Sequence, residues 1–231
     1  MSKEILLFSS GMDSYIAWLY LNKPDCLYVD LGHRYARKEK DALHWFVDQG
    51  MKLGVDNRLF LGDIEKEDAN IPMRNMFLAM IGSLYGDVIY IIAQKGEMDI
   101  PDRSEGFYKS ASEMLTLLWE KPKKVITPLA DMTKAQMAKW YMDNTELSMR
   151  DLMEKTVGCY SSKEGHCGEC SACFRKFCAF AAIGSNCEYI FEKDIRKWKG
   201  IKAYVKKLKK GKYDAQREAE TIQVLKECNL W

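Results

Sequence analysis

The segment Phe8-Ser9-Ser10-Gly11-Met12-Asp13-Ser14 decides the fold that this sequence predicts. It is a turn of small residues between an apolar run at residues 4–8 and an amphipathic run at residues 15–21. A strand that ends in such a turn and continues as a helix directs several backbone N–H groups from the positive helix end toward one point. We therefore expect a phosphate-binding loop here, formed by Phe8, Ser9, Ser10, Gly11, Met12, Asp13 and Ser14.

The residues of this turn distinguish three kinds of phosphate loop. The turn contains neither the Gly-x-Gly-x-x-Gly of dinucleotide folds nor the Gly-Lys-Ser/Thr of Walker loops, which leaves a pyrophosphate loop. In such a loop Ser9 and Ser14 would donate hydroxyls, Gly11 would let the phosphates approach the backbone, and Asp13 would anchor the loop or help to hold magnesium. A plain capped helix start is the alternative that this motif leaves open.

The same turn resembles the Ser-Gly-Gly-x-Asp-Ser loop of the ATP pyrophosphatase family, whose members adenylate a substrate and release pyrophosphate. Ser10 stands where that family usually has its first glycine. If this position requires a positive φ, a serine there costs about 1 kcal/mol more than glycine.

Short apolar runs alternate with stretches of helical periodicity along the first two thirds of the chain. The expected strands are residues 4–8, 26–30, 58–61, 87–93 and 124–126, and the expected helices are residues 15–21, 38–52, 74–85, 107–120 and 133–142. This alternation predicts a doubly wound α/β fold, in which a parallel sheet has helices on both faces. Ligands then bind at the carboxyl ends of the strands, where the strand order reverses.

After about residue 150 the strand pattern ends. A cysteine-rich turn precedes four expected helices, at residues 171–182, 189–197, 201–210 and 214–228. We therefore expect an α/β domain at residues 1–154 and a helical zinc-binding subdomain at residues 155–231. The lysine-rich run at residues 193–212 is interpreted as a solvated helix face rather than as an RNA-binding surface.

Four cysteines in the second part have the spacing of a metal site: Cys159, Cys167, Cys170 and Cys173. Two Cys-x-x-Cys turns allow four thiolates to converge tetrahedrally on zinc, and a closed site of this type is structural. His166 in place of one cysteine, or an iron–sulfur or redox role, remains as an alternative. The other cysteines, Cys26, Cys178, Cys187 and Cys228, are expected to be ordinary buried or partly buried thiols.

Composition limits the possible partners. The 231 residues include 35 Lys and Arg against 33 Asp and Glu, so the formal charge of +2 gives no general attraction to nucleic acids or acidic membranes. The chain starts without a signal peptide, and no window reaches the roughly 20 apolar residues of a membrane span. We expect a cytoplasmic enzyme with no nucleic acid or membrane partner.

With both motifs in place, the chain resembles the 7-cyano-7-deazaguanine synthase (QueC) family of ATP pyrophosphatases. The resemblance covers nearly the whole chain and rests, besides the phosphate loop, on Asp30-Leu31-Gly32-His33-Arg34, Ile71-Pro72-Met73-Arg74-Asn75, Ile100-Pro101-Asp102-Arg103 with Phe107, Ile126-Thr127-Pro128-Leu129 with Thr133-Lys134, Gly158-Cys159-Tyr160, and Cys167-Gly168-Glu169-Cys170-Ser171-Ala172-Cys173. The chain departs from the family at Ser10, at residues 31–33, and at Ile100 and Arg103, where the family has a tyrosine and a cysteine beside its base.

This resemblance implies an adenine nucleotide alpha hydrolase-like fold. It also implies an ATP-dependent conversion of 7-carboxy-7-deazaguanine and ammonia to 7-cyano-7-deazaguanine through an acyl-adenylate and an amide. ATP, Mg²⁺ and Zn²⁺ are the implied cofactors, and a homodimer is the implied assembly. Arg74 and Lys134 are the candidates for stabilising the charge on pyrophosphate or the acyl-adenylate. Asp102 is the candidate for the guanine-like edge, and Asn75 and Gln94 would assist orientation.

Two other functions remain open at this stage. One is a related adenylating enzyme, either an amide ligase that stops at the amide or a tRNA thiolase. A thiolase would normally need a catalytic cysteine pair near the nucleotide, and the zinc-type spacing uses the obvious cysteines. The other is a non-catalytic sensor of a nucleotide or base.

Overall fold

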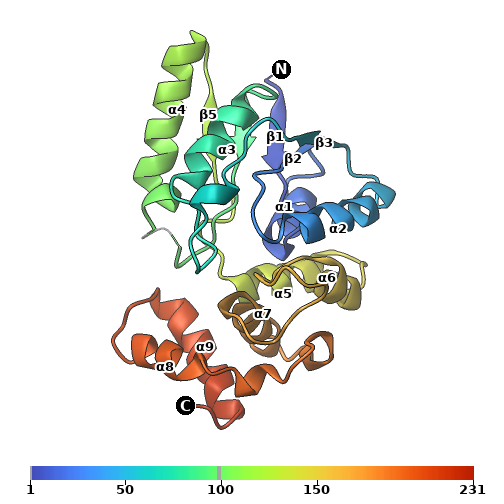
Figure 1. Ribbon diagram of the computed structural model, residues 1–231, viewed down its shortest axis with the longest axis vertical. Coiled ribbons are helices and arrows are strands. Elements are labelled where there is room, and N and C mark those ends of the chain that lie inside the picture. The colour runs from blue at the N-terminus through green and yellow to red at the C-terminus, as the bar shows by residue number, and fades with distance from the viewer. Residues whose placement is uncertain (1, 98–99) are drawn as a thin grey trace.

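Five parallel strands form the sheet in the computed structural model, which describes residues 2–97 and 100–231 (Figure 1). The strand order is β3-β2-β1-β4-β5, and every neighbouring pair is parallel. The strands are β1 (Glu4–Leu7), β2 (Cys26–Val29), β3 (Leu53–Asp56), β4 (Val88–Tyr90) and β5 (Lys124–Ile126). The order reverses between β1 and β4, so the predicted doubly wound α/β sheet is confirmed.

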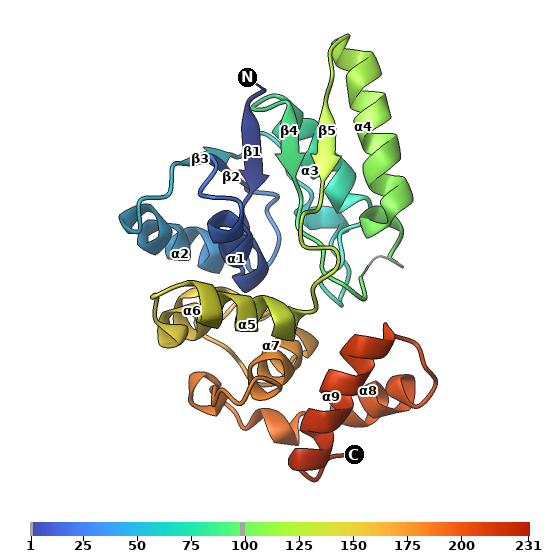
Figure 2. The same cartoon turned by 180° about the vertical axis from the view of Figure 1, so that it is seen from behind.

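Helices cover both faces of this sheet (Figures 1 and 2). Right-handed crossovers place α1 (Met12–Tyr20) and α2 (Ala36–Asp48) on one face while the chain moves outward to β3. The chain then returns to β4, so the crossovers α3 (Arg74–Ser83) and α4 (Glu105–Trp119) cover the other face. Alternate residues of β1 join different clusters, Leu6 with α1 and α2, and Ile5 and Leu7 with α3 and α4.

The prediction of a strand at residues 58–61 is wrong, because the strand lies earlier, at β3. Leu59, Phe60 and Leu61 have the apolar character of a strand, whereas β3 is a half-exposed edge strand that contains Gly54. The side chain of Asp56 accepts a hydrogen bond of 3.0 Å from the backbone N–H of Arg58. This turn ends the strand before the apolar run begins.

The C-terminal part is helical, as expected, with two differences in detail. Its helices are α5 (Lys134–Asn144), α6 (Met149–Lys155), α7 (Ser171–Ala181), α8 (Ile201–Leu208) and α9 (Ala215–Glu227). The short α6 was not predicted. The predicted helix at residues 189–197 is instead two 3-10 turns, Glu188–Ile190 and Ile195–Lys197, because the chain between them extends to pair Glu192 N–H with the His166 carbonyl.

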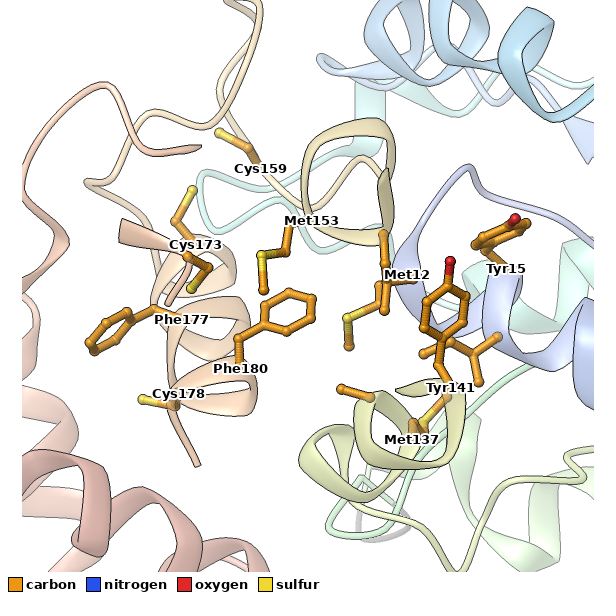
Figure 3. Close-up of a cluster of buried hydrophobic side chains, with 14 of the residues drawn as sticks. Met12, Tyr15, Met137, Tyr141, Met153, Cys159, Cys173, Phe177, Cys178 and Phe180 are labelled. Atoms are coloured by element: carbon orange, nitrogen blue, oxygen red, sulfur yellow. The ribbon is translucent and has the colours of Figure 1, made fainter. Parts of the chain in front are cut away.

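One hydrophobic core joins the sheet to these C-terminal helices. Figure 3 shows Met12 of α1 between Phe180 of α7 and Tyr141 of α5, with Met137 of α5 beside Tyr141. Tyr15 and Tyr141 are in ring contact, with 6.1 Å between centroids. The core is therefore continuous across the proposed boundary between residues 154 and 155, and that division stays a prediction.

None of the helices that the structure describes combines the length and the apolar character needed to cross a bilayer.

Candidate functional site

A cleft with a volume of about 260 Å³ opens at the carboxyl ends of β1, β2 and β4. The turn after β1, the first residues of α3 and α5, residues 157–160 and part of α7 form its walls. This is the position that the reversal of strand order predicts for a ligand.

The turn after β1 presents the start of α1 to the cleft. Gly11 is the N-cap residue of α1, and no side chain caps the helix, so its first N–H groups are available to an anion. A Cβ atom on Gly11 would lie 3.1 Å from Ser9 Oγ and 3.5 Å from the Val157 carbonyl oxygen, so the site is narrow at this glycine. Six of the seven predicted loop residues line the cleft: Phe8, Ser9, Gly11, Met12, Asp13 and Ser14.

Ser10 is the exception, because it is fully buried behind the turn. Its φ is +55°, so the position does require the left-handed conformation that favours glycine. Its Oγ donates a hydrogen bond of 2.8 Å to the Glu39 carbonyl oxygen. Ser10 therefore fixes the shape of the turn rather than facing a ligand.

Lys134 and Asp13 meet in the cleft, although 121 residues separate them in the chain. Lys134 Nζ lies 2.5 Å from each carboxylate oxygen of Asp13. A capping box of Thr133 and Gln136 begins α5 at this point and fixes the origin of the lysine side chain. The pair places one cation and one anion at the entrance to the α1 N-terminus.

Arg74, the first residue of α3, also lines the cleft, as does Asn75. Asp102 is absent from the described residues that line it. Its carboxylate accepts a hydrogen bond of 3.4 Å from the backbone N–H of Asn75, and its carbonyl oxygen accepts one of 2.7 Å from Asn75 Nδ2. Asp102 therefore fastens the start of α3, and its contact with a base stays a prediction that this placement does not favour.

Sequence reasoning missed several charged residues that line the cleft near β4. Arg103 forms an ion pair of 2.7 Å with Glu97, and Arg175 of α7 donates a hydrogen bond of 2.7 Å to the hydroxyl of Tyr160. Burial alone would raise the pKa of Glu97, but the charges of Arg103, Lys134 and Arg175 outweigh it and lower the pKa to about 2. The position of Glu97 after a strand was the only sequence signal for this group.

A second polar group lies at the end of β2. His33 Nε2 is 3.0 Å from Glu39 Oε2, and the Tyr28 hydroxyl donates a hydrogen bond of 3.2 Å to the same oxygen. All three side chains line the cleft beside the apolar residues Leu27, Val29 and Leu31. We call this half of the cleft, which combines these three apolar residues with one polar group, the apolar slot.

The four predicted metal ligands converge in space. The sulfur atoms of Cys159, Cys167, Cys170 and Cys173 all lie within 4.8 Å of one another, with 4.0 Å between those of Cys167 and Cys173. Tetrahedral zinc with bonds of about 2.3 Å separates its sulfur ligands by about 3.8 Å, so the group fits this metal.

Hydrogen bonding around the sulfurs also suits thiolates. Backbone N–H groups of Ser161 and Cys167 point at Cys159 Sγ, each at 3.4 Å. Hydrogen bonds from the Cys170 and Cys173 thiols lower the pKa of Cys159. The alternative ligand, His166, turns its Nε2 to Lys176 Nζ at 3.1 Å and stays outside the cluster.

Two comparisons with known proteins point to one family. The model of the family described as queuosine biosynthesis protein QueC matches residues 61–184. The chain is also 32% identical over 200 residues to a protein of Staphylococcus aureus (strain bovine RF122 / ET3-1) named 7-cyano-7-deazaguanine synthase. That alignment covers 74% of this chain and 89% of the Staphylococcus protein.

Proposed function

The chain belongs to the QueC family, and we propose on this basis that it converts 7-carboxy-7-deazaguanine and ammonia to 7-cyano-7-deazaguanine at the expense of ATP, as a step of queuosine-type biosynthesis. The observation that carries the proposal is the cleft at the strand reversal. It combines an uncapped helix N-terminus with Lys134 and Arg74, which suits a polyphosphate.

The reaction needs activation because the oxygen of a carboxylate is a poor leaving group. Attack of the carboxylate on the α-phosphorus of ATP forms an acyl-adenylate and releases pyrophosphate. Ammonia displaces AMP, and loss of one proton gives the amide. A second ATP adenylates the amide oxygen with release of pyrophosphate, and loss of AMP and of both nitrogen-bound protons leaves the nitrile.

Each group of residues in the cleft has a different role in this reaction, according to its position. The N–H groups at the start of α1, with Ser9 and Ser14, bind the β- and γ-phosphates that leave as pyrophosphate. Lys134 and Arg74 balance the negative charge that collects on the leaving group. Asp13 is the carboxylate of the phosphate loop, so a magnesium ion carried by ATP would bind there.

The four-cysteine group would hold zinc in a structural role. Among residues 2–97 and 100–231 the group consists of these four cysteines, which complete a tetrahedral zinc shell, so the ion would supply folding energy and no chemistry at the reacting carbon. Zinc would link Cys159 to the cysteines at the start of α7. This link would fix residues 157–160, which line one side of the cleft.

The rival functions differ in what they require of the cleft. A tRNA thiolase needs a reactive cysteine beside the nucleotide. Among the residues that the structure describes, Cys159 is the one cysteine that lines the cleft, and it belongs to the four-cysteine cluster. This favours the deazaguanine reaction over thiolation, whereas an amide ligase and a sensor would share the same cleft.

Product analysis separates these candidates. The protein is incubated with 7-carboxy-7-deazaguanine, ATP, magnesium and ammonium, and the product mass is measured together with AMP and pyrophosphate. The proposal predicts the nitrile with two AMP for each product molecule. An amide with one AMP would identify an amide ligase, and binding of ATP without any turnover would identify a sensor.

The cytoplasmic location, the homodimer and the absence of a nucleic acid partner belong to the same proposal and stay predictions. Gel filtration with light scattering tests the homodimer directly.

A further inference from the structure

The turn that follows β4 carries a buried polar atom with no partner. Gln94 is 3% exposed and lines the cleft, and its Oε1 makes no hydrogen bond within residues 2–97 and 100–231. An unsatisfied buried acceptor destabilises the folded state. Because this one faces a cleft, a ligand that donates an N–H or O–H there would remove this destabilisation.

The backbone of the turn holds a second acceptor, the Glu97 carboxylate, close to Gln94. The N–H of Glu97 donates a hydrogen bond of 3.0 Å to the Gln94 carbonyl oxygen, and Gly96 between them has a φ of +79°. A Cβ atom on Gly96 would lie 2.9 Å from Cδ of Arg217, so the turn packs closely on α9. Gln94 and Glu97 thus line the cleft together from one fixed turn.

Glu97 is a permanent acceptor. Its ion pair with Arg103 joins Arg103 Nη1 to Glu97 Oε2 at 2.7 Å, and the charges of Arg103, Lys134 and Arg175 keep the carboxylate ionised despite its burial. A carboxylate accepts hydrogen bonds and donates none. The turn therefore selects for a ligand edge that carries N–H donors.

The position of the turn in the cleft indicates which substrate it contacts. The phosphate loop follows β1, the apolar slot with Leu27, Val29 and Leu31 lies on the β2 side, and Gln94 and Glu97 lie on the β4 side. A nucleotide whose flat base occupies the apolar slot and whose phosphates reach α1 leaves the β4 side to the second substrate.

We propose that Gln94 and Glu97 bind the pyrimidine edge of the deazaguanine acid, taking its ring N–H and its 2-amino group, and so determine which base is accepted. This inference rests on the proposed function and assigns to Glu97 the recognition that the sequence suggested for Asp102. Asp102 is engaged with the start of α3, whereas Glu97 faces the cleft.

Two substitutions and one substrate analogue test the proposal. Glu97→Gln keeps the shape of the side chain but turns an amide N–H toward the base. Gln94→Leu removes the unpartnered oxygen. We expect either change to raise the KM for the acid by about 10- to 100-fold, the equivalent of one buried hydrogen bond to a charged or aligned group, and to leave the KM for ATP within about 2-fold.

The analogue has hydrogen in place of the 2-amino group. The parent protein should prefer the amino compound by at least about 100-fold in kcat/KM, since a site built for a donor rejects a ligand that lacks it. In Glu97→Gln this preference should fall to within about 5-fold. Glu105→Gln, an exposed carboxylate at the start of α4, is the matched control and should keep the preference of the parent.

Stability separates recognition from a structural role. Without substrate, Gln94→Leu should melt close to the temperature of the parent, because it removes a buried acceptor that has no partner and also the side-chain hydrogen bond from Gln94 to the Glu97 carboxylate. A parallel rise of the KM for ATP, or an unchanged preference in Glu97→Gln, would overturn the inference.

Binding of the acid, measured by calorimetry beside turnover, keeps the two proposals distinguishable. A parent protein that binds the acid through these residues but forms no product would refute the proposed function alone. Turnover of the acid by the parent with no effect of either variant would refute this inference alone. A parent that neither binds nor converts the acid would refute both.

Discussion

The backbone N–H of Val157 donates a hydrogen bond of 2.8 Å to the carbonyl oxygen of Ser10. Val157 lies two residues before Cys159 of the four-cysteine group, and Ser10 is the residue with positive φ in the predicted phosphate loop. Lys176 of α7 fastens the same segment, because its Nζ donates hydrogen bonds of 2.6 and 2.8 Å to the carbonyl oxygens of Met153 and Thr156. The cysteine cluster and the phosphate loop are thus joined by a short, buried chain of contacts.

Loss of the proposed zinc should therefore weaken ATP binding. Replacing Cys170 with serine removes one of the four proposed ligands, and the segment that supports Ser10 then loses its anchor. We expect zinc content near zero, a lower melting temperature and at least about a 10-fold rise in the Kd for ATP, measured by metal analysis, thermal unfolding and calorimetry.

Cys228→Ser is the control for this experiment. Cys228 is a half-buried free thiol at the end of α9 and lies outside the four-cysteine group. It should retain zinc and ATP affinity. Retention of ATP affinity in a zinc-free Cys170→Ser protein would show that the cluster and the loop are independent.

At Ser10 a glycine variant should be more stable than an alanine variant, whereas in backbone with negative φ the alanine variant is usually the more stable one. Ser10→Gly relieves the left-handed conformation, worth about 1 kcal/mol, and loses the hydrogen bond to Glu39, worth a similar amount, so the two nearly cancel. Ser10→Ala loses the bond and keeps the strain. Chemical denaturation should find the glycine variant about 1 kcal/mol more stable than the alanine variant, and equal stabilities would contradict this account.

The sequence predicts the fold well where a local pattern and the tertiary structure agree. The alternation of strands and helices and the run from Phe8 to Ser14 were sufficient for a doubly wound sheet. The predictions for residues 58–61 and 189–197 were wrong, because a hydrogen bond overrides the apolar or helical character of each segment, a local bond in the first and a long-range bond in the second. In one case Asp56 ends the strand early, and in the other His166 holds residue 192 in extended form.

The candidate site was predictable only in part. The phosphate loop and the cysteines are contiguous in sequence, so their spacing reveals them. Lys134 was proposed from a motif, but its pairing with Asp13 depends on where α5 begins relative to α1. Glu97 and Arg175 have no motif of their own and meet through the packing of α7 beside the end of β4, which no local pattern contains.

Acid should remove one specific contribution to stability. Asp56 is buried, accepts hydrogen bonds from Arg58 and from the Tyr85 hydroxyl at 2.8 Å, and its pKa is lowered from 3.8 to about 2, chiefly by the Arg58 side chain. A depressed carboxyl pKa stabilises the folded state above the unfolded pKa, and this contribution disappears as the pH falls through the folded pKa.

Asp56→Asn should thus cost about 1–2 kcal/mol at pH 7, after allowance for solvent screening at the exposed Arg58 guanidinium. The cost should shrink below about pH 4 and vanish near pH 2. Urea denaturation from pH 2 to 7 measures it. The exposed Asp25→Asn variant should follow the parent throughout, and a cost for Asp56→Asn that does not change with pH would refute the role of ionisation.

Lys134 provides the most direct test of the catalytic geometry. Its ammonium group is held 2.5 Å from both oxygens of Asp13 at the entrance to the α1 N-terminus, the position from which the proposed reaction would release pyrophosphate. Lys134→Gln keeps a polar side chain that is one atom shorter, and it removes the charge. We expect pyrophosphate release to slow by about 100-fold or more, the usual effect of removing one group that stabilises developing charge.

The matched control for this change lies on the same helix. Lys139 of α5 is exposed and, within the part of the chain that the structure describes, pairs with Asp143 one turn later, so Lys139→Gln should leave the rate unchanged within about 2-fold. Circular dichroism and the melting temperature of both variants exclude unfolding. A Lys134→Gln protein that releases pyrophosphate at the rate of the parent would remove the lysine from the reaction and leave its ion pair with Asp13 as a purely structural contact.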